Sequence, residues 1–216
     1  MPTKASGVAG PAVIELVGPL IDDGGAFART IAAVVERSGL QPRPGAIDQV
    51  AGASPGWALA TLLEGHGRGD PTPSVGEMVE ELVREWQRVA RGGGIAATSA
   101  AATAVRKAVA HRPVALLTGL PSAVAAAALE HAELGDLVPS LLAADGADGL
   151  PRHDRLQQWL GSGEAASAAT ALLASAPAML AAIGARCADV VLVGEGRPAS
   201  AMLAERQVAD LAEGLG

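Results

Sequence analysis

The chain has 216 residues and a formal net charge of −7, and half of its residues are apolar although it contains only one Phe, three Trp and no Tyr. This length suits one α/β domain with an inserted segment or a small helical cap, and argues against two large independent domains. The basic residues are spread along the chain, which excludes nucleic acid as an expected partner. A single cysteine, Cys187, excludes an internal disulfide and a cysteine-based zinc site.

No stretch of the sequence reaches the roughly 18 apolar residues, free of charges and helix breakers, that a membrane-spanning helix needs. The N-terminal segment also lacks the continuous apolar region of a signal peptide, because glycine, proline and Glu15 interrupt it. These patterns predict a cytoplasmic protein with no membrane partner.

The first part of the chain predicts a strand, a loop and a series of helices. The strand is expected at residues 12–17, and a helix follows between Asp23, a plausible N-cap, and Gly39, a plausible C-cap. After residue 40 the apolar residues recur only at helical spacing, with proline- and glycine-rich joints. The expected helices of this insertion are residues 44–50, 56–64 and 75–89.

Short apolar segments alternate with helical ones again after residue 91. The remaining helices are expected at residues 97–110, 122–133, 178–185 and 199–215 and from residue 153 on, and the remaining strands at residues 114–117, 137–143, 171–173 and 190–193. Such alternation is typical of a parallel sheet covered by helices on both faces, with its sites at the carboxyl ends of the strands. The predicted fold class is therefore α/β, with residues 1–22 and 92–216 forming a Rossmann-like core and residues 23–91 forming a helical cap inserted after the first strand.

The run VIELVGPLIDD, residues 13–23, closes the first strand. With this run at the end of the first strand, and with the order of strands and helices given above, the chain resembles the haloacid dehalogenase-like hydrolases. The resemblance is greatest to the phosphonatase-like branch, which has a helical cap after the first strand. The first motif of that family is an aspartate, any residue, a second aspartate (alanine in phosphonatases), a glycine and a threonine. The resemblance implies that Glu15 stands at the position of the nucleophile and Val17 at the position of the acid/base of the phosphatases.

Two later segments correspond to the second and third motifs of the family. VALLTG places Thr118 and Gly119 where a hydroxyl and a backbone N–H hold a phosphoryl oxygen. GLPRHD places Leu150 where a cation is expected, with Arg152 two residues on as a substitute and His153 beside it near the presumed site entrance. The resemblance thus implies a ligand site at Thr118, Gly119, Arg152 and His153, together with Ser175 in the segment of the fourth motif.

The fourth motif should supply aspartates that bind Mg²⁺, but LLASAPAMLAA has Ser175 and Ala176 there. Mg²⁺ prefers carboxylate oxygens, so no metal and no cofactor are expected. The cap lysine that phosphonatases use as a Schiff-base amine is also missing from GASPGWALATLL. Glu15 displaces its carboxylate by about one ångström relative to an aspartate, Val17 transfers no proton, and a missing cation weakens phosphoryl transfer.

Competing signals are weaker than this resemblance. GASPG matches a nucleophile elbow around Ser54, but Pro55 lacks the N–H that the oxyanion hole needs. GEGRPA, residues 194–199, fits a dinucleotide fingerprint, but the residues after it are too few for the rest of such a unit. Trp57 and Trp86 lie in the expected cap, where they pack the helices together or line the cleft.

Three hypotheses follow from the loss of charged site residues on a retained scaffold pattern. The first is a protein that binds a small molecule between core and cap, or a protein partner, without phosphatase activity. The second is an enzyme of specialised metabolism that uses the cleft for other chemistry, with Glu15 as general acid or base and Thr118 orienting the ligand. The third is an atypical hydrolase with Glu15 as nucleophile. The resemblance also implies a homodimer through the cap.

Overall fold

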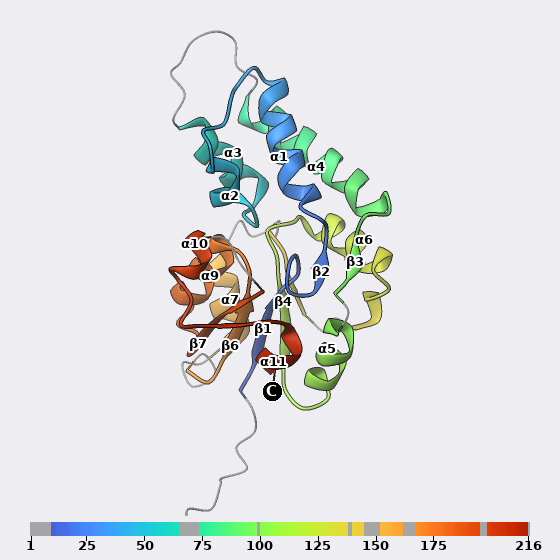
Figure 1. The fold of residues 1–216 in the computed structure, drawn as a ribbon, viewed down its shortest axis with the longest axis vertical. Coiled ribbons are helices and arrows are strands. Elements are labelled where there is room, and N and C mark those ends of the chain that lie inside the picture. Colours follow the sequence, from blue (N-terminus) through green and yellow to red (C-terminus); the bar gives the residue numbers. More distant parts are fainter. Residues whose placement is uncertain are drawn as a thin grey trace, which may run out of the picture.

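The computed structural model describes residues 10–64, 74–98, 100–137, 140–144, 152–161, 167–194 and 198–215 (Figure 1). The strands are β1 (Ala12–Glu15), β2 (Ile21–Asp22), β3 (Ala96–Ala97), β4 (Val114–Leu117), β5 (Leu141–Leu142), β6 (Thr170–Leu173), β7 (Asp189–Val193) and β8 (Arg206–Val208). The helices are α1 (Ala26–Arg37), α2 (Ala46–Val50), α3 (Pro55–Leu63), α4 (Val75–Arg91), α5 (Ala101–Val109), α6 (Ser122–His131), α7 (Arg152–Leu160), α9 (Ala176–Gly184), α10 (Pro198–Ala201) and α11 (Leu211–Leu215), with a 3₁₀ turn, η1, at Gly135–Leu137.

The core is a six-stranded sheet in the order β5-β4-β1-β6-β7-β8. All neighbouring strands in it run parallel. The central strands β1, β4 and β6 are short runs of apolar residues, as expected for strands that helices bury on both faces. The structure therefore confirms the predicted α/β class with a parallel Rossmann-like sheet.

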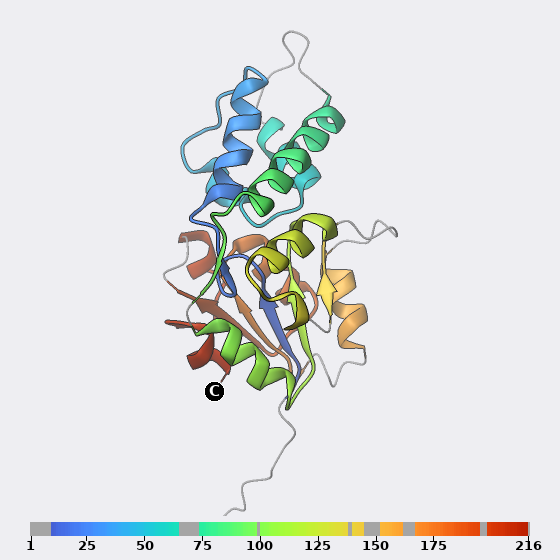
Figure 2. The same cartoon turned by 90° about the vertical axis from the view of Figure 1, so that its right-hand side faces the viewer.

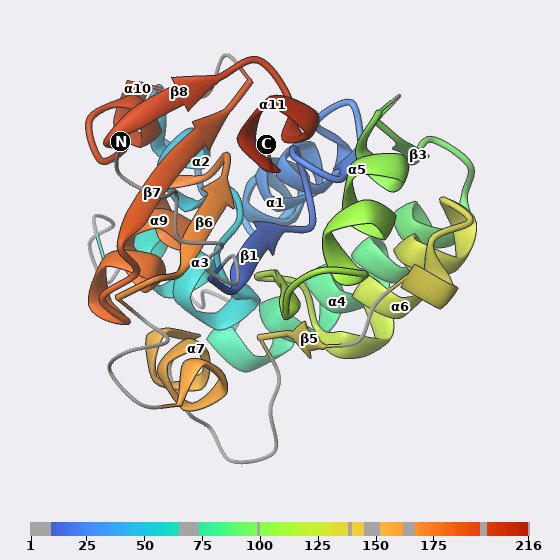
Figure 3. The same cartoon turned by 90° about the horizontal axis from the view of Figure 1, so that it is seen from below.

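Alternate side chains of the central strands point to opposite faces of the sheet, and each face has its own apolar cluster. Ile14 of β1 packs in a cluster that includes Val105 of α5 and Leu211 of α11. Val13 packs on the other face, in a cluster that includes Leu156 of α7 and Met179 of α9. Seen from below, α7 lies on the opposite side of the sheet from α5 and α11 (Figure 3). This two-sided packing holds the strand ends, and hence the site, in fixed register.

The cap consists of helices α1 to α4, which contact one another and stand over the carboxyl end of the sheet (Figures 1 and 2). The Asp23 carboxylate accepts hydrogen bonds in the first turn of α1, and Gly39, with φ of +84°, follows the last turn. A Ser74–Glu77 capping box starts α4. The structure thus confirms a helical cap inserted after the first strand, while the exact domain boundaries stay a prediction.

The two chain segments that connect core and cap pair with each other. Strand β2 leads towards the cap and β3 returns from it, and the two form an antiparallel pair in which Ile21 lies opposite Ala97. Thr98 then donates a hydrogen bond to the carbonyl oxygen of Pro19. The sequence analysis missed both strands because each has two residues, too few for any periodic pattern.

The predicted helix at residues 199–215 is wrong. Strand β8 interrupts this segment and extends the sheet beside β7, with Val208 opposite Val193. An ion pair between Arg206 and Asp189 joins the same two strands. Pairing with the edge of the sheet satisfies the backbone hydrogen bonds of this segment, and this gain does not show in the local spacing of apolar residues.

Within the described ranges, no helix combines the length and the apolar character that a membrane span requires.

Candidate functional site

Three neighbouring strands of the sheet end at the same point below the cap. Glu15 is the last residue of β1, Thr118 follows β4, and Ser175 lies two residues after β6. Strand β1 pairs with both of the other strands, so their carboxyl ends are adjacent. The structure thus brings together Glu15, Thr118, Gly119 and Ser175, which the sequence analysis selected.

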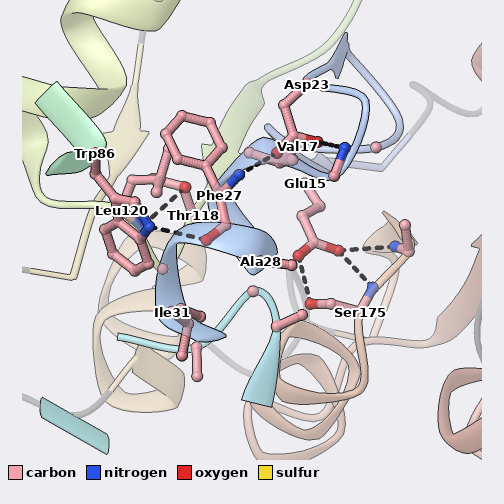
Figure 4. Close-up of a pocket in the computed structure, with 17 residues that line it drawn as sticks. Glu15, Val17, Asp23, Phe27, Ala28, Ile31, Trp86, Thr118, Leu120 and Ser175 are labelled. Atoms are coloured by element: carbon pink, nitrogen blue, oxygen red, sulfur yellow. Dashed lines mark hydrogen bonds between the residues drawn. The ribbon is translucent and has the colours of Figure 1, made fainter. Parts of the chain in front are cut away.

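The Glu15 carboxylate is tied to the loop that follows β6 (Figure 4). Its Oε2 accepts hydrogen bonds from the backbone N–H groups of Ala174 at 2.7 Å and Ser175 at 2.8 Å, and its Oε1 accepts one from the Ser175 hydroxyl. Only 2% of Glu15 is exposed. Because Ser175 is the N-cap residue of α9, the negative charge of Glu15 lies at the positive end of that helix.

The Thr118–Gly119 turn follows directly after β4 and lines the cavity below the cap. The Thr118 side chain is buried, and its Oγ1 accepts a hydrogen bond from the backbone N–H of Leu120 at 3.1 Å. The Thr118 backbone N–H donates to Leu142 of the neighbouring strand at 3.1 Å. The hydroxyl is therefore held at the end of β4, just before α6 begins.

The cap contributes a second carboxylate, Asp23, to the site. Its Oδ1 accepts a hydrogen bond from the N–H of Gly25 at 3.0 Å, and its Oδ2 accepts one from the N–H of Phe27 at 2.8 Å. This carboxylate therefore satisfies the start of α1, as a capping residue does. The sequence predicted Asp23 itself as the N-cap residue, but Gly25 takes that position and Asp23 lies two residues before it. The place of Asp23 beside the cavity was not predicted, because it depends on how the cap sits on the core.

Two aromatic rings form one wall of the site. Phe27 and Trp86 pack edge to face, with ring centroids 6.0 Å apart and an interplanar angle of 88°. The indole N–H of Trp86 donates to the carbonyl oxygen of Phe27 at 3.1 Å. Trp86 thus both packs α1 against α4 and lines the cavity, whereas Trp57 is 49% exposed.

Gly52, in the loop between α2 and α3, brings the cap backbone onto the Glu15–Ser175 pair. A Cβ atom at Gly52 would lie 2.3 Å from the Ser175 Oγ and 3.0 Å from the Glu15 Oε1. Its φ of +85° also favours glycine. The sequence analysis missed this contact, since nothing in the local sequence tells which side chain of the core the loop will meet.

These groups enclose a cavity of about 300 Å³ between core and cap. Its described lining is mostly apolar, and the charged side chains in this described part are two carboxylates. The lining residues are Glu15, Val17, Gly18, Asp23, Gly25, Phe27, Ala28, Ile31, Ala51, Gly52, Ala53, Trp86, Thr118, Gly119, Leu120, Ala174 and Ser175. None of these residues is a lysine, an arginine or a histidine, so the part of the lining that the structure describes has no cationic side chain.

The residues present do not fit a Mg²⁺ ion. Mg²⁺ takes hard oxygen ligands at about 2.0–2.1 Å in octahedral geometry, usually with carboxylates among them. Here the Ser175 hydroxyl bonds directly to Glu15, and the Asp23 carboxylate caps α1. Within the described ranges, no three His, Cys, Asp or Glu residues are grouped as a metal site would require.

The structure does not bring His153 to the cavity, which corrects the expected position near the site entrance. His153 lies against Gly184, because a Cβ at that glycine would be 3.2 Å from the His153 Cβ. Gly184 is the last residue of α9, whereas Ser175 caps its start, and a helix rises about 1.5 Å per residue. Arg152 is the first residue of α7, but its side chain lies outside what the structure describes, as does Leu150.

The competing motifs have plain structural places. Ser54 is the N-cap residue of α3 and Pro55 its first residue, as a turn before a helix requires. GEGRPA follows β7, and its last two residues begin the short helix α10, whereas residues 195–197 lie outside the described ranges. Gly52 and Ala53 of the first motif line the cavity, but its Ser54 does not.

Comparison with known proteins reveals similarity at the level of structure. No protein-family model matches the sequence, and a search of curated proteins finds no relative. The chain is similar to CbbY from Rhodobacter sphaeroides in complex with phosphate, with 18% identity, a TM-score of 0.74, and coverage of 95% of this chain and 96% of that chain.

Two further solved structures give the same result. A haloacid dehalogenase-like family hydrolase from Streptococcus pneumoniae has 13% identity and a TM-score of 0.72, over 95% of this chain and 96% of that chain. A β-phosphoglucomutase from Clostridium difficile has 13% identity and a TM-score of 0.73, over 94% and 92% of the two chains. The chain therefore has the fold of the haloacid dehalogenase-like hydrolases, with a helical cap inserted after the first strand of the core.

Proposed function

We propose that this protein binds a small molecule in the cavity between core and cap and does not transfer phosphoryl groups. The observation that carries the proposal is the bond network of Glu15. Its carboxylate accepts hydrogen bonds from Ala174 and Ser175 at the start of α9, where the fold would otherwise place the Mg²⁺ ligands. A side chain of the protein thus supplies the negative charge at this helix end, where an anionic group of a ligand would otherwise bind.

The charges of the lining support the same proposal. Phosphoryl transfer relies on cations that offset the charge of the transferred group. Among the described residues the cavity offers two carboxylates and no cationic side chain, so a phosphate group would face repulsion that these residues do not compensate. Val17, which also lines the cavity, provides no proton for a leaving group.

A phosphatase assay tests this proposal directly. The purified chain is incubated with p-nitrophenyl phosphate and with a panel of sugar phosphates in millimolar Mg²⁺, beside Glu15→Ala as the matched control. We expect no difference between the two proteins. Mg²⁺-dependent turnover that is lost in Glu15→Ala would overturn the proposal and favour an atypical hydrolase with Glu15 as nucleophile.

Two observations favour that atypical hydrolase as the competing candidate. Thr118 and Gly119 keep their place beside the cavity, and Glu15 keeps a carboxylate at the end of β1. The similar structures also include a β-phosphoglucomutase and a predicted phosphoglycolate phosphatase from Haemophilus somnus. The missing acid/base at Val17 and the missing metal ligands at Ser175 rank this candidate second.

A repurposed enzyme is the other candidate, with Glu15 as general acid or base in chemistry that moves no phosphoryl group. Its support is that Glu15 lines an enclosed, mostly apolar cavity and is held by three hydrogen bonds. An identified substrate whose turnover falls with Glu15→Gln, and shows a pH profile that depends on Glu15, would establish it.

A protein partner and a homodimer through the cap remain proposals of the same kind. Trp57 of α3 is an exposed aromatic residue on the cap, and such residues are enriched at interfaces. Light scattering after gel filtration distinguishes a monomer from a dimer, and Trp57→Ser should weaken a dimer that forms through this face.

A further inference from the structure

We propose, on the basis of the proposed function, that the cavity binds an uncharged ligand with an apolar body and one oxygen acceptor, such as a ketone or an alcohol. Three features of the cavity carry this inference. They are the charges of its lining, the character of its aromatic wall, and the two hydrogen-bond donors that the protein leaves unused at the end of β4.

The unused donors lie at the Thr118–Gly119 turn. Thr118 Oγ1 already accepts from the N–H of Leu120, so its own hydrogen remains to be donated, and the described part of the chain offers it no acceptor. The buried backbone N–H of Gly119 likewise has no hydrogen-bond partner among the described residues. Buried N–H groups are nearly always paired, so both groups call for a ligand atom that accepts hydrogen bonds.

This requirement separates the ligand classes. An ammonium group has donors only: it could donate to the remaining lone pair of Thr118 Oγ1, but it cannot accept from the Thr118 hydroxyl or from the N–H of Gly119. A carboxylate or phosphate can accept, but it would join Glu15 and Asp23 in a cavity whose described lining holds no cationic side chain. Both of those carboxylates already cap helices through backbone N–H groups, so no positive helix end at α1 or α9 is left for a third anion. An uncharged carbonyl or hydroxyl oxygen meets all of these conditions.

The remaining surface of the cavity is apolar. Phe27, Ile31, Trp86 and Leu120 line it, and the indole N–H of Trp86 is occupied by the carbonyl of Phe27 (Figure 4). The wall formed by these side chains therefore offers the ligand contact area and no further hydrogen bond. The volume of about 300 Å³ lies at the lower end of the usual range for ligand pockets, which indicates a small body such as a single ring.

Three probes with the same ring test the ligand class: cyclohexanone, cyclohexylamine and cyclohexanecarboxylate at neutral pH. Binding is followed by the fluorescence of Trp86 in a chain in which Trp57 and Trp159 are replaced by Phe, and by the thermal shift of the unmodified chain. We expect cyclohexanone to bind with a Kd at least about tenfold lower than that of either charged probe. Equal or tighter binding of the amine or the carboxylate, or no binding of cyclohexanone by either readout, overturns the proposal.

Variants of Thr118 test the donor. Thr118→Val keeps the shape but removes the hydroxyl, and should weaken cyclohexanone binding about tenfold. Thr118→Ser should restore it, and Thr103→Val, an exposed threonine on α5 outside this cavity, should leave it unchanged. Unchanged binding in folded Thr118→Val contradicts the assigned donor.

The outcomes also separate this inference from the proposed function. Phosphatase turnover in Mg²⁺ refutes the proposed function whatever the probes do. A preference for the carboxylate probe without such turnover refutes the ligand class alone.

Discussion

Replacing Gly52 by alanine tests how tightly the cap loop meets the core. The added methyl group would lie 2.3 Å from the Ser175 Oγ and 2.6 Å from the Ser175 Cβ, and the backbone at Gly52 has a φ of +85°. The left-handed conformation costs a residue with a Cβ roughly 1–2 kcal/mol. An extra methyl group in a packed site costs about 1–3 kcal/mol more. The free energy of unfolding should therefore fall by about 2–5 kcal/mol.

Gly45→Ala is the matched control for this prediction. Gly45 is also in the cap, with a φ of +78°, but no atom lies within 4 Å of an added Cβ. It therefore suffers only the conformational cost, and the effect of alanine on the unfolded chain is the same for both variants. Urea unfolding, followed by tryptophan fluorescence, gives both free energies. We expect Gly52→Ala to be less stable than Gly45→Ala by about 1–3 kcal/mol.

A difference below about 0.5 kcal/mol, the usual scatter of surface substitutions, would contradict this reasoning unless the cap opens to relieve the clash. Opening has its own signature, because Trp86 is 2% exposed. Acrylamide would then quench its fluorescence more strongly in Gly52→Ala than in Gly45→Ala. Equal stability together with equal quenching would refute the close contact between the cap loop and the core.

Three further predictions follow from single contacts. Glu15→Gln removes the negative charge to which two backbone N–H groups and a hydroxyl donate, and should lower the free energy of unfolding by about 1–3 kcal/mol. The control Glu36→Gln, at an exposed position, should change it little. Equal effects of the two variants would argue against a structural role of the Glu15 charge. Ser74→Ala should lower it by about 1 kcal/mol by removing the cap of α4. The backbone N–H and the hydroxyl of Ser74 lower the pKa of Glu77, so their contribution is complete above pH 4.5 and is lost as the pH falls through the lowered value. Urea titrations should show the variant losing part of its deficit there, because the bond from the Glu77 N–H to Ser74 Oγ does not titrate; a constant deficit would contradict the linkage. Burial raises the pKa of the Cys187 thiol from 9.0 to about 11. At pH 8 this thiol should therefore react with a disulfide reagent about 100-fold more slowly in the folded chain than in urea. Equal rates would show that the thiol is accessible and ionises normally.

Much of the sheet could be predicted from the sequence because its central strands are buried on both faces. The apolar runs at β1, β4, β6 and β7 have no other stable place than the interior of such a sheet, and the structure confirms all four. The edge strand β8 could not be predicted in the same way, since two of its three residues are exposed and its stability comes from pairing with β7.

The sequence by itself determined which residues reach the carboxyl edge of the sheet. Glu15, Thr118 and Ser175 each follow an apolar strand, and adjacent parallel strands must end side by side. Their residue types are also the basis of the proposal that the protein does not transfer phosphoryl groups.

Only the tertiary structure decided what these residues do to one another. The bond from Ser175 to Glu15 spans 160 positions of the chain, and the approach of Gly52 and Asp23 depends on how the cap sits over the core. His153 was expected near the site entrance, but it lies against Gly184 at the end of α9 that is far from the cavity. Local patterns fix which strand end a residue occupies, whereas packing between distant segments fixes the direction and the hydrogen-bond partners of its side chain.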